Sequence, residues 1–214
     1  MSRFVILLGG DLVPTPRVEH ALAGARVIAA DSGMRHAAAL GVEPELWTGD
    51  FDSVPEHLLA EWPDTPRQVF PAGKDKTDGE LAVDAALARG ATSLVLAGAF
   101  GGARADHAYL HLALAVKLFE QGVAVSLTDG AQEGHPLPVG LARFDYQPGT
   151  LFSLIGFSDL AGLSVRGARW PLKQIQMPFG SSLTISNEVT GELEIELGNG
   201  RAMLIAHPYP LPTF

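Results

Sequence analysis

Two aspartates stand two residues apart in the segment Thr48-Gly49-Asp50-Phe51-Asp52-Ser53, directly after a short apolar run. In an extended chain, residues i and i+2 point to the same side, so Asp50 and Asp52 are expected to face one point. Gly49 lets the backbone approach that point closely. Adjacent carboxylates repel each other unless a cation lies between them, and Mg²⁺ is the usual cation where phosphates are handled. The segment therefore predicts a Mg²⁺ site.

A polar turn is the alternative interpretation of the same segment. Ser53 is a possible cap of a helix that begins at Pro55, and Glu56 would complete a capping box. The two interpretations are compatible, because a cap explains Ser53 and Glu56 but not the two aspartates before them.

Further polar residues follow other predicted strands, at the sheet edge where open α/β proteins bind ligands. Gly9-Gly10-Asp11 follows the first strand and is by itself only a turn signal. Asp31 follows the second strand, and it is either a neighbour of a helix cap or a third acidic ligand.

A basic and acidic stretch opens the next long helix. Lys74 and Lys76 precede Thr77, which begins the helix and is expected to form a capping box with Glu80. Asp78 lies in the first turn of this helix. An acid there interacts favourably with the helix dipole. The free N–H groups of the same helix end also suit a phosphate, to which the lysines add positive charge and Asp78 a metal ligand.

The glycine-rich segment from Gly98 to His107 forms another junction between a strand and a helix. Gly101 and Gly102 permit close backbone approach, and Arg104 offers a planar fork for phosphate oxygens. Asp106 is a possible cap of the following helix.

Two histidines in that helix, His107 and His111, have the i, i+4 spacing of zinc ligands. The glutamate that follows the first histidine in zinc proteases is absent, because Ala108 stands there. A capping or surface position is therefore favoured for these histidines.

The elements that must position these residues alternate between strands and helices over the first two-thirds of the chain. The expected strands are 4–8, 27–30, a segment near 46, 68–70, 93–97 and 123–127, and the expected helices are 18–25, 32–40, 55–61, 77–89 and 106–121. Ser32 is expected to cap the helix at 32–40, and Gly41 is expected to end it. Apolar strands that alternate with helices predict an α/β domain of three layers, with a parallel sheet covered on both faces.

The pattern changes after a segment rich in Gly and Pro at 130–140, which is predicted to be a linker. Strands are expected near 144 and at 151–157, 163–165, 183–185, 192–197 and 202–206, with a hairpin turn at 198–200. Residues 192–197 alternate polar and apolar side chains, as in a sheet with one wet face. We therefore predict two domains, 1–135 and 136–214, the second a small antiparallel sandwich or barrel.

The composition limits the classes of protein to consider. The chain has 214 residues, a formal net charge of −9 and no Cys, so it has no disulfide, no thiolate metal site and no Cys nucleophile. The negative charge disfavours binding to nucleic acid or to an anionic membrane. No segment approaches the ~20 apolar residues of a membrane span, and the apolar start of the chain reads as a strand rather than a signal peptide. A cytoplasmic location is expected.

These motifs, taken in order, resemble the thiamine pyrophosphokinase family over nearly the whole chain. The resemblance rests on Asp31-Ser32-Gly33, GVEPELWTGDFDS at 41–53, KTDGELA at 76–82, GAFGGARADH at 98–107, ARWPLKQ at 168–174 and SLTISNEVTG at 182–191. It implies transfer of pyrophosphate from ATP to thiamine, with Mg²⁺ as cofactor and AMP as the second product. It also implies a Rossmann-like first domain, a β-sandwich second domain and a homodimer with its active sites at the subunit interface.

The resemblance extends to individual residues. Asp50, Asp52 and Asp78 match the family's Mg²⁺–ATP acids, and Asp31 matches the acid of its Asp-Gly-Gly motif. Arg104 and Asp106 match its Arg-x-Asp-His motif. Ser186 and Asn187 match the serine and asparagine of its thiamine pocket, and Trp170 stands where an aromatic residue is expected.

Taken together, the motifs predict these sites: catalytic Asp50, Asp52, Asp78 and Asp106; ATP-binding Asp31, Lys74, Lys76, Thr77, Gly101, Gly102 and Arg104; thiamine-binding Trp170, Ser186 and Asn187. The residues leave Asp78 and Asp106 as equal candidates for the base that takes the hydroxyl proton.

The sequence also departs from the family pattern. Ser32 replaces a glycine, Gly79 stands where a larger residue is common, and one extra residue separates Gly102 from Arg104. These departures leave open a non-catalytic sensor of nucleotide or thiamine diphosphate. The acidic pair after a strand also fits a Mg²⁺-dependent phosphohydrolase, with Asp50 as nucleophile and Asp52 as its acid partner.

Overall fold

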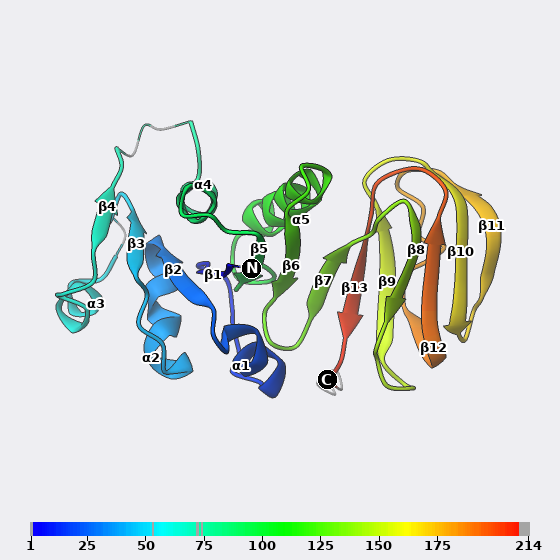
Figure 1. The fold of residues 1–214 in the computed structure, drawn as a ribbon, viewed down its shortest axis with the longest axis horizontal. Coiled ribbons are helices and arrows are strands. Elements are labelled where there is room, and N and C mark those ends of the chain that lie inside the picture. Colours follow the sequence, from blue (N-terminus) through cyan, green and yellow to red (C-terminus); the bar gives the residue numbers. More distant parts are fainter. Residues whose placement is uncertain (1, 53, 72, 74, 210–214) are drawn as a thin grey trace. The chain divides into compact units, whose positions relative to one another are not determined.

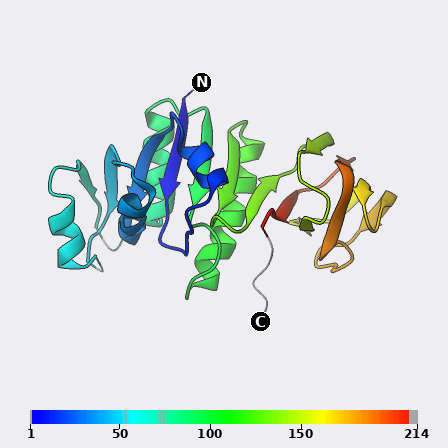
Figure 2. The same cartoon turned by 90° about the horizontal axis from the view of Figure 1, so that it is seen from below.

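The structure, a computed structural model, describes residues 2–52, 54–71, 73 and 75–209, which divide into two units, Met1–Gly130 and Ala131–Phe214. Figures 1 and 2 show helices and strands in the first unit and strands in the second. An α/β unit with parallel strands is thus followed by an antiparallel β unit, as the sequence predicts. The domain boundary at residue 135 stays a prediction.

The first unit is built on a parallel sheet. Its strands are β1 (Arg3–Leu7), β2 (Arg26–Ala30), β3 (Leu46–Gly49), β4 (Arg67–Val69), β5 (Ser93–Ala97) and β6 (Ala124–Thr128), in the spatial order β6-β5-β1-β2-β3-β4. The chain progresses in one direction from β1 to β4 and in the other from β5 to β6. The switch point between β1 and β5 is where such sheets bind ligands, outside the carboxyl ends of the strands.

Helices cover both faces of this sheet (Figures 1 and 2). They are α1 (Pro16–Leu22), the 3₁₀ helix η1 (Asp31–Arg35), α2 (His36–Leu40), α3 (Glu56–Glu61), α4 (Asp78–Ala88) and α5 (Ala105–Glu120). Successive residues of β1 point to opposite faces, and Phe4 to Leu7 are all at most 1% exposed. The core is therefore continuous on both sides, which explains the near-unbroken apolar runs in these strands.

Several predicted helix ends are correct. Thr77 and Glu80 form the expected capping box at the start of α4, and Gly41, with φ 63°, ends α2 in the left-handed conformation.

Other predicted caps are wrong. Ser32 caps no α-helix, since a 3₁₀ turn from Asp31 to Arg35 comes first. Pro55 is the N-cap of α3 and makes no side-chain cap bond, while Ser53 lies outside the described residues. The N-cap of α5 is Arg104, so Asp106 belongs to the first turn instead.

The second unit consists of β7 (Glu133–Pro136), β8 (Gly140–Phe144), β9 (Leu151–Gly156), β10 (Leu160–Ala168), β11 (Leu172–Met177), β12 (Asn187–Leu197) and β13 (Ala202–His207). Its pairings are antiparallel. The long strand β12 pairs with β9 near its start and with β8 and β10 further on, so it joins β9 and β13 to β8, β10 and β11 around one apolar core.

The alternation predicted at 192–197 is confirmed in β12. Leu193, Ile195 and Leu197 are buried, whereas Glu194 faces outward between Arg143 of β8 and Arg166 of β10, with contacts of 2.8 and 3.1 Å. Both arginines lie opposite Glu194 in the strand register. They hold the pKa of Glu194 below its ordinary value through these hydrogen bonds.

Three predictions for the second unit are wrong. The expected linker at 130–140 contains β7, and residues 183–185 lie in turns rather than a strand. Residues 198–200 make no hairpin between adjacent strands, because β12 and β13 each pair with β9. The strand β11 was not expected, since its mixed polar and apolar residues carry little periodicity. None of the described helices combines the length and hydropathy needed to cross a membrane.

Candidate active site

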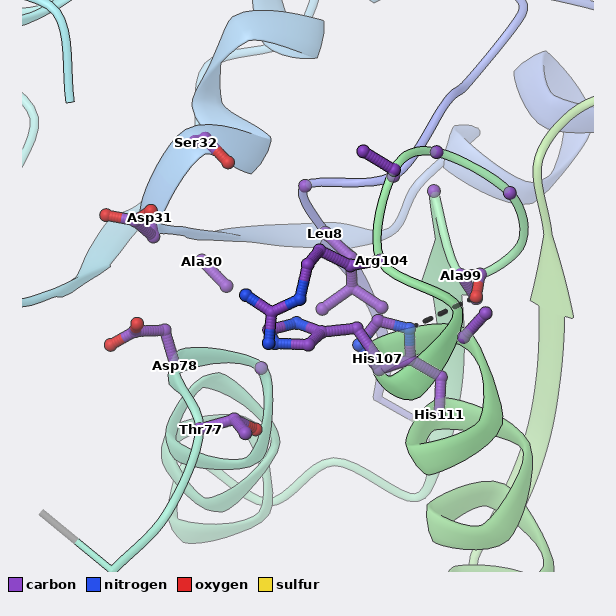
Figure 3. A pocket seen from close by; sticks show the side chains of 18 of the residues that line it. Leu8, Ala30, Asp31, Ser32, Thr77, Asp78, Ala99, Arg104, His107 and His111 are labelled. Carbon is purple, nitrogen blue, oxygen red and sulfur yellow. Dashed lines mark hydrogen bonds between the residues drawn. The ribbon is translucent and has the colours of Figure 1, made fainter. Parts of the chain in front are cut away.

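A cavity of about 530 Å³ opens in the first unit at the carboxyl ends of the strands (Figure 3). The loops after β1, β2, β3 and β5 and the first turns of α4 and α5 form its wall. Its lining includes the predicted site residues Asp31, Asp50, Asp52, Lys76, Thr77, Asp78, Gly101, Gly102 and Arg104. The tertiary structure thus brings together segments that lie far apart in the sequence, at the switch point of the sheet.

Three half-buried carboxylates converge in this cavity. Asp31, Asp50 and Asp78 each offer an oxygen, and these oxygens all lie within 4.8 Å of one another. Figure 3 shows Asp31 and Asp78 on the same side of the cavity, although they come from different elements. Such a set of hard oxygen donors suits Mg²⁺. The sequence left two interpretations of Asp31 open, a neighbour of a helix cap or a third acidic ligand. Its position beside Asp50 and Asp78 favours the second.

Local backbone geometry holds Asp31 in position. It adopts φ 45° at the end of β2, and its carbonyl accepts a 2.8 Å hydrogen bond from Nε1 of buried Trp47. A Cβ at Gly49 would lie 3.3 Å from Oδ1 of Asp31, so the glycine leaves room for this carboxylate. Gly49, which belongs to β3, is therefore also needed for the position of Asp31 at the end of the neighbouring strand β2.

Asp52 is oriented differently from the expectation. Phe51 adopts φ 63°, so the chain turns between the two aspartates instead of running extended. The backbone N–H of Asp52 donates to Oδ1 of Asp50 at 3.3 Å. Asp52 is exposed and lines the same cavity, but it is not a member of the carboxylate cluster found among the described residues.

Two residues that no sequence motif indicated, Arg35 and His36, hold the glycine loop after β1 in place. Arg35 donates through Nη2 to the carbonyls of Gly9 and Gly10 at 2.7 and 3.0 Å, and Nε2 of His36 donates to Gly10 at 2.9 Å. Burial lowers the pKa of His36, against the effect of this hydrogen bond. The sequence contains only a weak signal for this role, because a basic pair such as Arg35-His36 at the start of a helix usually lies on the surface.

The same loop packs against the loop after β5. A Cβ at Gly10 would lie 2.3 Å from the carbonyl oxygen of Gly98 and 2.9 Å from that of Phe100. Only a glycine therefore allows the two loops to meet at the switch point, which accounts for the Gly-Gly pair that seemed a plain turn.

The basic residues of the site have acidic neighbours in this state. Lys76 pairs with Asp84 in the second turn of α4, and a hydrogen bond to that carboxylate raises the pKa of Lys76. Arg104 pairs with Asp106, and Figure 3 shows Arg104 extending from its loop into the cavity. Lys74, the other predicted lysine, lies outside the described residues.

The two histidines of α5 are not equivalent. Both line the cavity, and their rings meet edge to face with centroids 6.3 Å apart. His111 is only 7% exposed and bonds to the carbonyl of Ala99 through Nδ1, at 3.1 Å. The surface or capping position favoured for His111 by the sequence is therefore wrong, because the second turn of α5 faces the loop after β5.

The predicted thiamine-binding residues lie in the second unit. The buried amide of Asn187 accepts from the backbone N–H of Trp170 at 3.1 Å and donates to its carbonyl at 2.9 Å, while the Trp170 side chain is 55% exposed. Ser186 adopts φ 61°, and its N–H donates to Oγ of Ser153 at 3.0 Å. The structure thus brings Asn187 and Trp170 together, with Asn187 holding the tryptophan backbone.

Comparison with known proteins supports this arrangement of two units. Residues 19–127 match the family described as thiamin pyrophosphokinase, catalytic domain, and residues 143–202 match the thiamin pyrophosphokinase, vitamin B1 binding domain. A curated relative, the thiamine pyrophosphokinase of Bacillus subtilis, is 31% identical over 166 residues, which are 76% of this chain and 77% of the relative.

Solved structures agree with these matches. The crystal structure of a Bacillus subtilis thiamine pyrophosphokinase aligns with a TM-score of 0.84 and 27% identity, covering 96% of this chain and 99% of that one. The thiamin pyrophosphokinase from Geobacillus thermodenitrificans aligns with a TM-score of 0.79 and 28% identity, covering 97% of each chain. On these grounds the chain belongs to the thiamin pyrophosphokinase family.

Proposed function

We propose that this enzyme transfers the terminal pyrophosphoryl group of ATP to the hydroxyl of thiamine, giving thiamine diphosphate and AMP. The observation that carries the proposal is the convergence of Asp31, Asp50 and Asp78 at the switch point, beside Arg104 and the first turn of α4. Such an arrangement can neutralise a polyphosphate that lies across the strand ends.

The carboxylate cluster fits Mg²⁺ by the chemistry of its donors. Asp31, Asp50 and Asp78 would hold the cation, with Asp52 as the further acid that the sequence predicts. When bound, the cation offsets the negative charge of the phosphates and polarises their oxygens. Mg²⁺ rather than another divalent ion is part of the proposal.

The chain's own residues would position the phosphates. The guanidinium of Arg104 and the ammonium of Lys76 supply positive charge. The N–H groups at the start of α4, around Thr77, and the backbone near Gly101 and Gly102 supply donors. Arg104 must exchange Asp106 for phosphate oxygens to do so.

The reaction balances without further reactants. The thiamine hydroxyl oxygen bonds to the β-phosphorus, and the bond from that phosphorus to the oxygen bridging the α-phosphorus breaks, so AMP leaves with the bridging oxygen. The hydroxyl proton passes to a carboxylate, for which Asp78 and Asp106 are the two candidates. Asp106 accepts a proton poorly while Arg104 holds it, because that pairing lowers its pKa.

We further propose that thiamine binds with the help of Trp170, Ser186 and Asn187. Thiamine is cationic and aromatic, and the exposed face of Trp170 suits such a ring. In the proposed homodimer these residues of one subunit complete the cavity of the other.

Incubation with ATP, Mg²⁺ and thiamine, followed by identification of the products, tests the proposal. AMP and thiamine diphosphate in equal amounts are expected. Inorganic phosphate without AMP would instead support the phosphohydrolase, and binding without turnover would support the sensor. The Asp50→Asn variant is the inactive control, because it removes one charge of the carboxylate cluster and keeps the shape of the side chain.

A further inference from the structure

His111 is a buried polar residue with no part in the mechanism above. It projects from the second turn of α5 to the wall of the cavity, where Figure 3 shows it beside His107 and bonded to Ala99. Buried polar atoms usually have hydrogen-bond partners, so a partner is expected for each of the two ring nitrogens.

The hydrogen bond to Ala99 determines which nitrogen carries the proton. A backbone carbonyl can only accept, so Nδ1 of His111 must donate across the 3.1 Å contact. Burial lowers the pKa of the ring, with a further lowering by His107, while the Ala99 bond and Glu80 act in the opposite direction. The lowered pKa favours the neutral ring, in which Nδ1 carries the proton and Nε2 is an acceptor.

The surroundings of Nε2 are small and mostly apolar, with the hydroxyl of Thr77 as a polar neighbour. A Cβ at Gly79 would lie 3.7 Å from Nε2 and 2.9 Å from Cδ2 of Leu8, so the glycine leaves this nitrogen uncovered. Leu8, Ala99 and Ala108 also line the cavity. Among the described residues, the hydrogen bonding of the His111 ring is confined to Nδ1.

A mostly apolar wall with a nitrogen acceptor suits a flat ring that carries one donor group. Under the proposed function, on which this inference rests, both substrates contain such a ring: the adenine of ATP and the aminopyrimidine of thiamine. We propose that Nε2 of His111 accepts a hydrogen bond from the exocyclic amino group of a substrate's aminated heteroaromatic ring, and that it selects for that group.

Binding measurements on the intact protein distinguish the two sources. One arm compares Mg²⁺-ATP with the Mg²⁺ complex of purine riboside 5′-triphosphate, which lacks the 6-amino group. The other compares thiamine with its 4-deamino analogue. We expect the dissociation constant to differ about three- to tenfold in one arm, as for the loss of one hydrogen bond, and to be equal in the other.

Two variants separate ligand recognition from a structural role. His111→Asn has an amide nitrogen near the Nδ1 position to donate to Ala99 but no atom at Nε2, so the preference should fall below twofold with little change in melting temperature. His111→Gln has a polar atom near Nε2 and loses the Ala99 contact, so part of the preference should remain while the melting temperature falls.

Equal binding of both members of both pairs by the wild-type protein would overturn the inference. So would a preference that survives in His111→Asn. Calorimetry needs no turnover, so a protein that binds ATP and thiamine without making AMP contradicts the proposed function and still tests His111. Failure to bind either ligand would overturn both.

Discussion

Arg104, which lines the cavity, forms a two-point contact with Asp106, which does not, with Nε to Oδ1 at 2.9 Å and Nη2 to Oδ2 at 2.6 Å. The guanidinium holds the pKa of the Asp106 carboxyl well below its usual range. Both side chains are exposed, so solvent screens the pair and its contribution to stability is small. Its importance lies in function, because a phosphate would compete with Asp106 for the same fork of donors.

Arg104→Ala should therefore impair the use of ATP much more than that of thiamine. We expect kcat/KM for ATP to fall about 100-fold or more, because charge on the transferred group loses its partner, with a far smaller change in the KM for thiamine. Arg104→Lys should recover only part of the loss, since lysine lacks the planar fork. Arg143→Ala, a similarly exposed arginine of the second unit, is the control. A drop confined to thiamine would place the nucleotide elsewhere.

Asp78→Asn should abolish turnover without harming the fold. Removing one of three clustered charges relieves repulsion, so the protein without Mg²⁺ should melt at the same temperature or higher. Product formation should fall at least about 100-fold, and the stabilisation by Mg²⁺ with ATP should disappear. Melting curves with and without Mg²⁺ and ATP provide the measurement, with the exposed Asp64→Asn as control. Normal activity at saturating Mg²⁺ would exclude Asp78 from the metal site.

Gly10→Ala should separate the two loops at the switch point. The new Cβ would lie 2.3 Å from a backbone carbonyl that cannot rotate away as a side chain can. We expect a loss of about 1–3 kcal/mol in the free energy of unfolding, and weaker ATP binding. Gly191→Ala, where a Cβ meets nothing within 4 Å, should leave both quantities nearly unchanged. Equal effects of the two substitutions would contradict the close packing of the loops.

Stability should decrease as the pH falls below the ordinary histidine range. The pKa values of His36 and His111 are lowered in the fold, chiefly by burial, so the unfolded chain takes up protons first. Their contribution is complete above pH ~6.5 and is lost as the pH falls from there toward the folded pKa values, at up to about 1.4 kcal/mol per pH unit for each ring.

Urea unfolding at pH 5.5 to 7.5 measures this slope. His36→Asn and His111→Asn should each flatten it, since one titrating group is removed. A wild-type protein equally stable at both ends of the range would show that the buried rings gain protons as readily as the unfolded chain does.

Two inactive variants should restore each other if the active site is shared between subunits. Asp50→Asn removes a charge of the first unit, and Trp170→Ala removes an exposed ring of the second, so each should fold. In a symmetric dimer with free subunit exchange, an equal mixture contains one intact site in each hybrid, which corresponds to about a quarter of wild-type activity. No recovery after proven exchange would mean that each site is built within one chain.

The sequence by itself determined the order of strands and helices in the first unit and several strands of the second. Alternation of apolar strands with capped helices predicted the parallel sheet, because buried strands need apolar residues on both faces. The polar-apolar alternation in β12 likewise predicted a sheet with one wet face. Rules of this kind depend on neighbours in the chain, which is why the capping box of Thr77 and Glu80 was predicted correctly.

Only the tertiary structure decided which side chains meet. The sequence paired Asp50 with Asp52 by assuming an extended chain, but the positive φ of Phe51 turns the backbone between them. Asp31 joins Asp50 and Asp78 because parallel strands end at one sheet edge and Gly49 leaves space there. His111 became a cavity residue because α5 packs beside the loop that contains Ala99. Such contacts between distant segments depend on strand order and close packing, which local sequence patterns do not encode.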